Sequence, residues 1–129
     1  MEANFSIMSL HLRYRMWIAA LNYDITVLRI FDDYLKELSS KQEISEVKTG
    51  ISRFQEQFID LRKEIDELRH EMHLLKMKLA AYSRGGKALD QDTYQADRHA
   101  ALKKSYNSFR RKFTRAKAEF SEFEGKWLF

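Results

Sequence analysis

Apolar side chains recur every three or four residues along most of the chain, and the pattern is clearest between residues 44 and 82. A repeat that averages 3.5 residues keeps one line of side chains turned toward a partner helix, and no strand follows this period. The pattern predicts a helix over residues 41–83, with Ser40 and Glu43 forming a capping box at its start and Gly85 and Gly86 ending it. Its apolar positions are Ile44, Val47, Ile51, Phe54, Phe58, Leu61, Ile65, Leu68, Met72, Leu75, Leu79 and Tyr82.

Two further segments carry the same period and predict helices over residues 6–38 and 91–124, the second beginning near Asp90 or Asp92. The first has apolar residues at Ile7, Leu10, Tyr14, Trp17, Leu21, Leu28, Phe31, Leu35 and Leu38. The second has them at Leu102, Tyr106, Phe109, Phe113, Ala116, Phe120, Phe123 and Trp127. Short links force each helix to run against the one before it. The sequence therefore predicts one all-α domain over residues 1–129, an elongated antiparallel three-helix bundle of coiled-coil type.

The segment 6–38 carries a second apolar line, roughly opposite the first. Its members are Leu12, Met16, Ala19, Tyr23, Val27, Ile30 and Tyr34. A helix that is apolar on both sides is normally covered on both sides, and two helices of the same chain cover only one side and part of the flanks. We therefore expect this line to pack against a second copy of the protein in an isologous homodimer. The alternative is that the other helices wrap the first one more fully.

Asp24 falls where the apolar series of the first helix expects an apolar residue, beside Ile25. A lone buried carboxylate is costly, so a core position requires a cation or several hydrogen-bond donors beside it. We expect a lysine or arginine of the second or third helix to meet Asp24 and to fix the register of the bundle. A catalytic role would need a second titratable group and a pocket, and the pattern indicates neither.

Composition narrows the possibilities. The chain has no proline and no cysteine, which favours long helices and excludes disulfides and thiolate metal sites. The N-terminal residues do not follow the pattern of a secretory signal, and the longest apolar run, from Met16 to Leu21, is far too short to span a bilayer. We expect a cytoplasmic, soluble protein without membrane insertion. The net charge of +4 permits an acidic partner without requiring one.

Positive charge is concentrated in the third helix, where no acidic residue occurs between Arg98 and Lys117. A face made of these residues could bind the phosphates of a nucleic acid or another polyanion. The candidate residues are Lys103, Lys104, Arg110, Arg111, Arg115 and Lys117. Nearby aromatic residues lie on the core line and cannot stack on bases. The alternative is that the basic residues are solvated or pair with acids of the second helix, which are Asp60, Glu64, Asp66, Glu67 and Glu71.

Motifs for catalysis or metal binding are weak. Glu67 and His70 match the Glu-x-x-His spacing of di-iron bundles, but such a site needs a second copy of the motif, and none occurs. His70 and His73 lie three residues apart, which is not the spacing of zinc proteases. We therefore expect no cofactor, no metal and no enzymatic activity. The sequence favours a structural or protein–protein interaction protein that acts as a homodimer, with nucleic-acid or polyanion binding as the alternative.

Several stretches spread over most of the chain share features with known proteins. They are Trp17, Phe54-Gln55-Glu56-Gln57-Phe58-Ile59, Leu68-Arg69-His70-Glu71 and Trp127. In these features the chain resembles a group of small bacterial three-helix coiled-coil proteins with no assigned activity. The resemblance implies a bacterial, stand-alone protein and transfers no functional residues. The three-helix plan and Trp17 are also similar to a spectrin-type repeat, although helix lengths differ and a tandem copy is missing.

Overall fold

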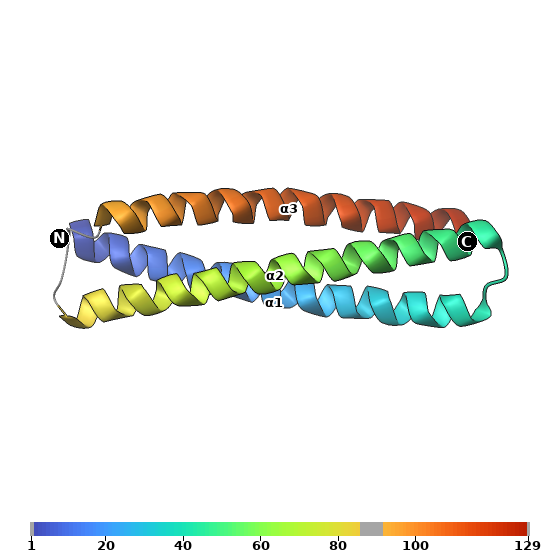
Figure 1. Cartoon of the computed structure of the whole chain (residues 1–129), viewed down its shortest axis with the longest axis horizontal. Coiled ribbons are helices and arrows are strands. Elements are labelled where there is room, and N and C mark those ends of the chain that lie inside the picture. The colour runs from blue at the N-terminus through green and yellow to red at the C-terminus, as the bar shows by residue number, and fades with distance from the viewer. Residues whose placement is uncertain (1, 86–91, 129) are drawn as a thin grey trace.

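The computed structural model describes the backbone of residues 2–85 and 92–128 and the side chains of residues 7–81 and 97–127. Three helices make up this part of the chain, α1 (Glu2–Lys41), α2 (Ser45–Gly85) and α3 (Asp92–Leu128). They lie side by side, α2 running against α1 and α3 against α2, so that the molecule is a long rod (Figure 1). The predicted all-α three-helix bundle is confirmed. Both α1 and α3 are longer than the ranges 6–38 and 91–124 predicted from the sequence.

The link between α1 and α2 lies later in the chain than the sequence indicated. The prediction that α2 begins at residue 41 with a capping box at Ser40 and Glu43 is wrong, because α1 continues to Lys41 and α2 begins at Ser45. The hydroxyl of Ser40 donates a hydrogen bond of 2.7 Å to the carbonyl oxygen of Glu37 instead. A serine inside a helix commonly bonds back to the preceding turn in this way. No glycine or proline between residues 36 and 49 stops α1 earlier.

Ile44 takes the N-cap position of α2, because its carbonyl oxygen accepts a hydrogen bond of 3.0 Å from the backbone amide of Lys48. An isoleucine offers no side-chain acceptor to the free amides of the first turn, so this helix start is weakly capped. The prediction that Ile44 belongs to the core is wrong, because its side chain is exposed. The other predicted apolar positions of α2 from Val47 to Leu79 are buried, and the side chain of Tyr82 lies outside the described residues.

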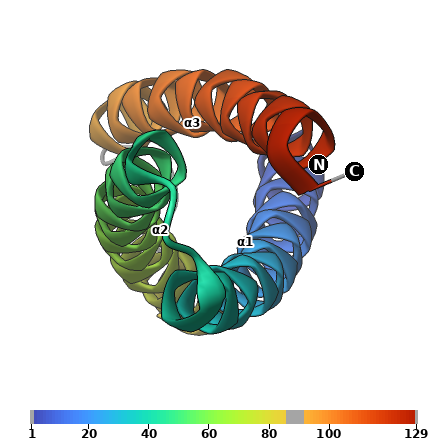
Figure 2. The same cartoon turned by 90° about the vertical axis from the view of Figure 1, so that its right-hand side faces the viewer.

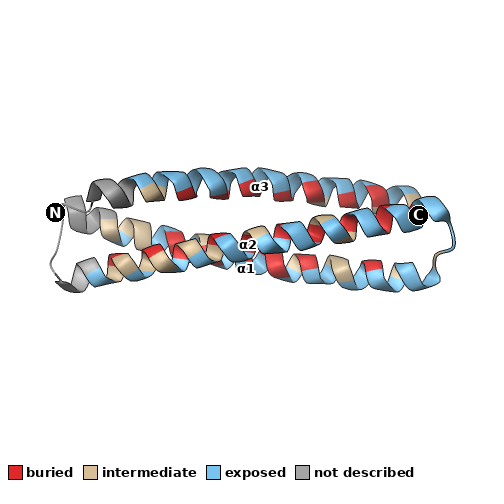
Figure 3. Cartoon of the chain, in the orientation of Figure 1, coloured by how far each residue is buried: buried red, intermediate tan, exposed pale blue. Residues whose placement is uncertain are grey.

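The core is one continuous apolar cluster along the rod, to which each helix contributes its inward side (Figure 3). At one point α2 and α3 come very close. A Cβ atom added to Gly50 of α2 would lie 2.4 Å from Cε1 of Phe123 in α3. Glycine therefore lets the Phe123 ring pack directly against the α2 backbone.

The seam between α1 and α3 is wider than the other two. No described Cα atom of α1 lies within 8 Å of a Cα atom of α3, whereas α2 approaches both helices within that distance. Viewed along the rod, the helices surround the core on three sides (Figure 2). Large rings fill the wide seam, since the ring centroids of Trp17 and Tyr106 lie 4.7 Å apart and those of Phe31 and Phe120 lie 4.5 Å apart. The bulk of these side chains sets the distance between the two helices.

Candidate interaction surfaces

The side of α1 that faces away from α2 carries a line of apolar residues, which we call the outer stripe. It consists of the seven positions Leu12, Met16, Ala19, Tyr23, Val27, Ile30 and Tyr34. Val27 is half-buried and the other six are exposed. Met8, which is 73% exposed, lies one turn before Leu12 and extends the line. The sequence reasoning missed Met8, although its distance of four residues from Leu12 continues the helical spacing.

The α3 helix covers one edge of the outer stripe in part. Val27 packs against the core cluster, and the ring of Tyr34 meets that of Phe120 edge-on with centroids 6.2 Å apart. At Val27 and Tyr34 the alternative prediction, that the other helices of the same chain cover α1 more fully, therefore holds in part. The other large members of the outer stripe, Leu12, Met16, Tyr23 and Ile30, are exposed to solvent.

The other helices expose fewer large apolar residues. On α2 these are Ile59 and Met77, which are 18 residues apart, and the described part of α3 has none. Scattered apolar residues are normal on a monomer. Along α1, by contrast, the exposed apolar residues follow one another in a single line, and a continuous exposed apolar patch commonly marks an interaction site. The outer stripe is therefore the distinctive surface of the described molecule.

Asp24 is buried in the wide seam between α1 and α3, with 2% of its surface exposed. Its partner is Arg110 of α3, which donates hydrogen bonds from Nη1 to Oδ2 and, at 3.5 Å, from Nη2 to Oδ1. The guanidinium also lies between 5.7 and 5.9 Å from the ring centroids of Tyr106, Phe109 and Phe113. A charge pair held in such surroundings joins α1 to α3 at one register.

A cluster of rings extends the same seam toward the start of α3. The hydroxyl of Tyr14 and Nδ1 of His99 form a hydrogen bond of 2.7 Å, and the ring of Trp17 stacks on that of His99 with centroids 5.9 Å apart. Burial raises the pKa of Tyr14 to about 12 and lowers the pKa of His99, and Arg13 and Lys103 lower the latter further. These surroundings favour the neutral imidazole over the charged one. The sequence analysis did not predict this cluster, because Tyr14 and His99 lie 85 residues apart.

The basic residues of α3 from Lys103 to Lys117 differ in their surroundings. Arg110 binds Asp24 of α1, Lys112 lies 3.0 Å from Glu64 of α2, and Lys117 lies over the ring of Phe113 in its own helix. Four others are exposed and have no acidic partner among the described residues, namely Lys103, Lys104, Arg111 and Arg115. The predicted polyanion face therefore retains only part of its charge on the surface.

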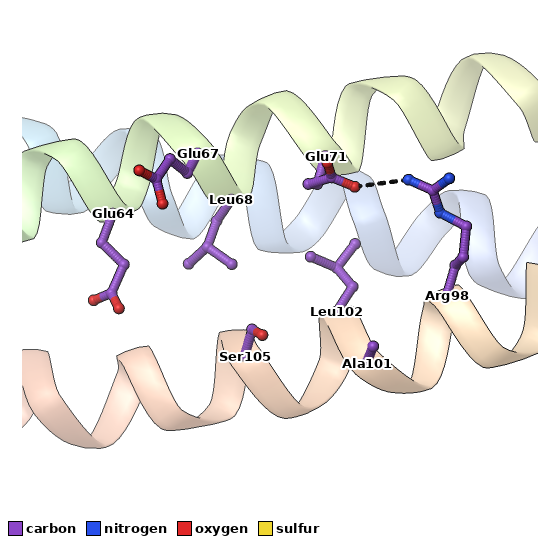
Figure 4. Close-up of a pocket in the computed structure, with 8 residues that line it drawn as sticks. All are labelled: Glu64, Glu67, Leu68, Glu71, Arg98, Ala101, Leu102 and Ser105. Atoms are coloured by element: carbon purple, nitrogen blue, oxygen red, sulfur yellow. Dashed lines mark hydrogen bonds and ion pairs between the residues drawn. The ribbon is translucent and has the colours of Figure 1, made fainter.

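A shallow groove between α2 and α3, of about 370 Å³, is lined by acids on one side (Figure 4). Arg98 bridges it with a contact of 3.1 Å to Glu71. Glu64 and Glu71 therefore pair with α3, as the alternative for the basic residues predicted. Asp66 instead contacts Arg62 and Arg69 within its own helix.

Neither a metal site nor a membrane span is found in the described part of the chain. No group of three or more His, Cys, Asp or Glu side chains there is arranged to hold a metal ion. His70 and His73 are both exposed, as is Glu67. None of the described helical segments is apolar enough over a sufficient length to cross a bilayer.

The chain was compared with protein families, curated proteins and solved structures. No family model, curated protein or solved structure matches the chain.

Proposed function

We propose that this protein is a non-enzymatic structural or interaction protein that works as a homodimer, with α1 at the centre of the assembly. The observation that carries this proposal is the outer stripe, an exposed apolar line along a single helix of an otherwise amphipathic bundle. The occupant that fits a stripe on one helix of this rod is the same stripe on a second rod.

The shape of the molecule supports association along its length. Its accessible surface is 8923 Å² for 15.5 kDa. A compact monomer of this mass would expose about 7,200 Å². A rod leaves more of its side chains in water, and a second rod laid lengthwise covers the largest share of them.

Sedimentation velocity over a range of concentrations tests the proposal. We expect a dimer at tens of micromolar for the wild type and a monomer for Tyr23→Glu and for Ile30→Glu, because each would place a charge in an apolar interface. All three proteins should keep the same helical circular dichroism. Met77→Glu is the matched control, since Met77 on α2 is 66% exposed, as is Tyr23. A monomeric wild type at these concentrations would exclude the homodimer.

Polyanion binding through α3 is the second candidate. It is favoured by the four exposed basic residues without acidic partners, Lys103, Lys104, Arg111 and Arg115. Gel shifts with duplex DNA and with single-stranded RNA at low and moderate salt test it, because phosphate binding weakens steeply with salt. The informative variant reverses Lys104, Arg111 and Arg115 to glutamate and spares Arg110, which holds Asp24 in the core. Retained binding in that variant, or no binding by the wild type, would remove this candidate.

A further inference from the structure

The outer stripe reads the same in both directions along α1. From Leu12 to Tyr34 its members are separated by 4, 3, 4, 4, 3 and 4 residues, so that Tyr23 lies at the centre. In an isologous interface each residue meets the symmetry-related position of the other copy. If two identical antiparallel helices are to pack apolar residue against apolar residue, the spacing of these residues must be the same when it is read in either direction. The spacing of the outer stripe meets this condition.

Three exposed residues define the middle line of the stripe. Met16, Tyr23 and Ile30 are seven residues apart and therefore lie on one side of the helix, and each is at least 60% exposed. In an antiparallel pair with its two-fold axis at Tyr23, Met16 of one copy faces Ile30 of the other, and the two Tyr23 rings meet. In a parallel pair every residue would face its own copy. Apolar packing is possible in both arrangements, so another property must decide between them.

Charge decides in favour of the antiparallel arrangement. The described N-terminal half of α1 carries Arg13 and Arg15 and has no acidic residue from Ile7 to Tyr23. Farther along, Asp33 is exposed, while its neighbours Asp32 and Glu37 bind Lys36 and Lys41 of the same helix. Arg15 and Asp33 lie eight and ten residues on either side of Tyr23, and because they are about five helical turns apart they share one flank of α1. Antiparallel packing brings Arg15 of one copy close to Asp33 of the other on that flank, whereas parallel packing brings Arg15 and Asp33 each to the level of its own copy.

The position of the axis also determines how far the two rods overlap. Tyr23 lies within two residues of the middle of α1, which runs from Glu2 to Lys41. A two-fold axis at this residue aligns the two copies of α1 over nearly their full length of about 60 Å. An axis nearer either end would leave apolar residues of the stripe uncovered. Full overlap covers every member from Leu12 to Tyr34 on both copies.

From the spacing, the exposure and the charges we infer that the outer stripe binds the outer stripe of a second copy in antiparallel orientation, with the two-fold axis at Tyr23. This inference rests on the proposed homodimer and adds its orientation and its centre. Unlike dimerisation alone, it requires that Met16 of one copy faces Ile30 of the other and that the two Tyr23 side chains meet.

Site-specific cross-linking tests the orientation, because the chain has no cysteine of its own. The variants Met16→Cys, Tyr23→Cys and Ile30→Cys each carry one thiol, and a short bis-maleimide reagent joins thiols that face each other. We expect Tyr23→Cys to cross-link to itself. An equimolar mixture of Met16→Cys and Ile30→Cys should give the mixed product, identified by mass spectrometry, while each alone gives little. Met77→Cys is the control for random collisions and should remain uncross-linked.

The possible outcomes separate the orientation from the dimer itself. Products joining Met16→Cys to itself and Ile30→Cys to itself, without the mixed product, would show a parallel dimer. They would overturn the inference and leave the proposed function in place. Absence of all products together with a monomeric wild type in sedimentation would overturn both. Cross-linking of Met77→Cys as efficient as that of Tyr23→Cys would also overturn the inference.

A charge exchange gives an independent readout. Arg15→Asp or Asp33→Arg alone places like charges beside each other in the antiparallel dimer, and we expect the dissociation constant to rise about 5-fold in either variant. The double variant restores opposite charges and should return the constant to within about 2-fold of the wild type. In a parallel dimer these residues face their own copies, so each single variant exchanges one like-charge pair for another and would leave the dissociation constant nearly unchanged.

Discussion

The two sides of α1 carry the same kinds of apolar residue, yet these residues have very different surroundings. Leu21 is fully buried in the core, with 0% of its surface exposed, while Leu12 on the outer stripe is 56% exposed. Similar contrasts occur elsewhere between groups that contact another helix and identical groups that do not. Arg110 contrasts with Arg111, Gly50 with Gly125, and His99 with His73. Substitutions in such pairs distinguish residues that stabilise the bundle from residues that are exposed for binding.

The largest effect is expected for the two leucines. Leu21→Ala removes a fully buried side chain and should lower the free energy of unfolding by about 3–4 kcal/mol. Leu12→Ala removes an exposed side chain and should change the stability of the monomer by less than about 0.5 kcal/mol. Urea unfolding at low protein concentration measures both, and sedimentation should show that Leu12→Ala weakens self-association. Equal losses of stability would mean that Leu12 contributes to the fold of the single chain.

The second pair is Arg110 and Arg111. Arg110→Ala leaves the carboxylate of Asp24 buried without a cation, and we expect a loss of about 3 kcal/mol in the free energy of unfolding. Arg111→Ala, one residue later on the exposed side of α3, should cost less than about 0.5 kcal/mol. The combination Asp24→Leu with Arg110→Met removes both charges and should recover most of the stability. If the combination is as unstable as Arg110→Ala alone, the buried charge is not the cause.

The third pair consists of glycines inside helices. Gly125→Ala adds a methyl group with nothing within 4 Å of it and should raise stability by about 0.5–1 kcal/mol through helix propensity. Gly50→Ala has the same advantage, but its methyl would overlap the Phe123 ring. We expect Gly50→Ala to be less stable than Gly125→Ala by about 2 kcal/mol. Thermal unfolding of both variants measures the difference, and equal stabilities would mean that the ring moves away freely.

The smallest effect concerns pH. Burial, followed by Arg13 and Lys103, lowers the pKa of His99 below the 6.5 of the unfolded chain. The neutral ring therefore contributes stability that is present above about pH 6.5 and is lost as the pH falls toward the lower folded pKa. We expect Tm to fall between about pH 7.5 and pH 5.5, and the fall to be smaller in His99→Gln. The control His73→Gln, on the exposed surface of α2, should retain the full fall.

The sequence predicted the helices and their inward sides because burial in a bundle follows the same period as the helix. It failed at Ser40, since a capping pattern and an ordinary helix interior contain the same residues when no glycine or proline follows. Asp24 could be identified as a core position from its place in the apolar series. Its partner could not, because the register of α3 against α1 depends on how bulky rings fill the seam. The same limitation applies to Tyr14 and His99, whose contact depends on that register.

The short link between α1 and α2 has a consequence for the order of folding. Core residues on either side of it, such as Leu35 and Val47, are close in sequence, so bringing their ends of the helices together costs little chain entropy. The contact between Asn22 and Arg69 spans 47 residues, and that between Asp24 and Arg110 spans 86. We expect the helical hairpin to form from the link outward, with α3 docking last. Truncating Leu35 or Val47 should then slow refolding, whereas truncating Phe109 should mainly accelerate unfolding in stopped-flow measurements.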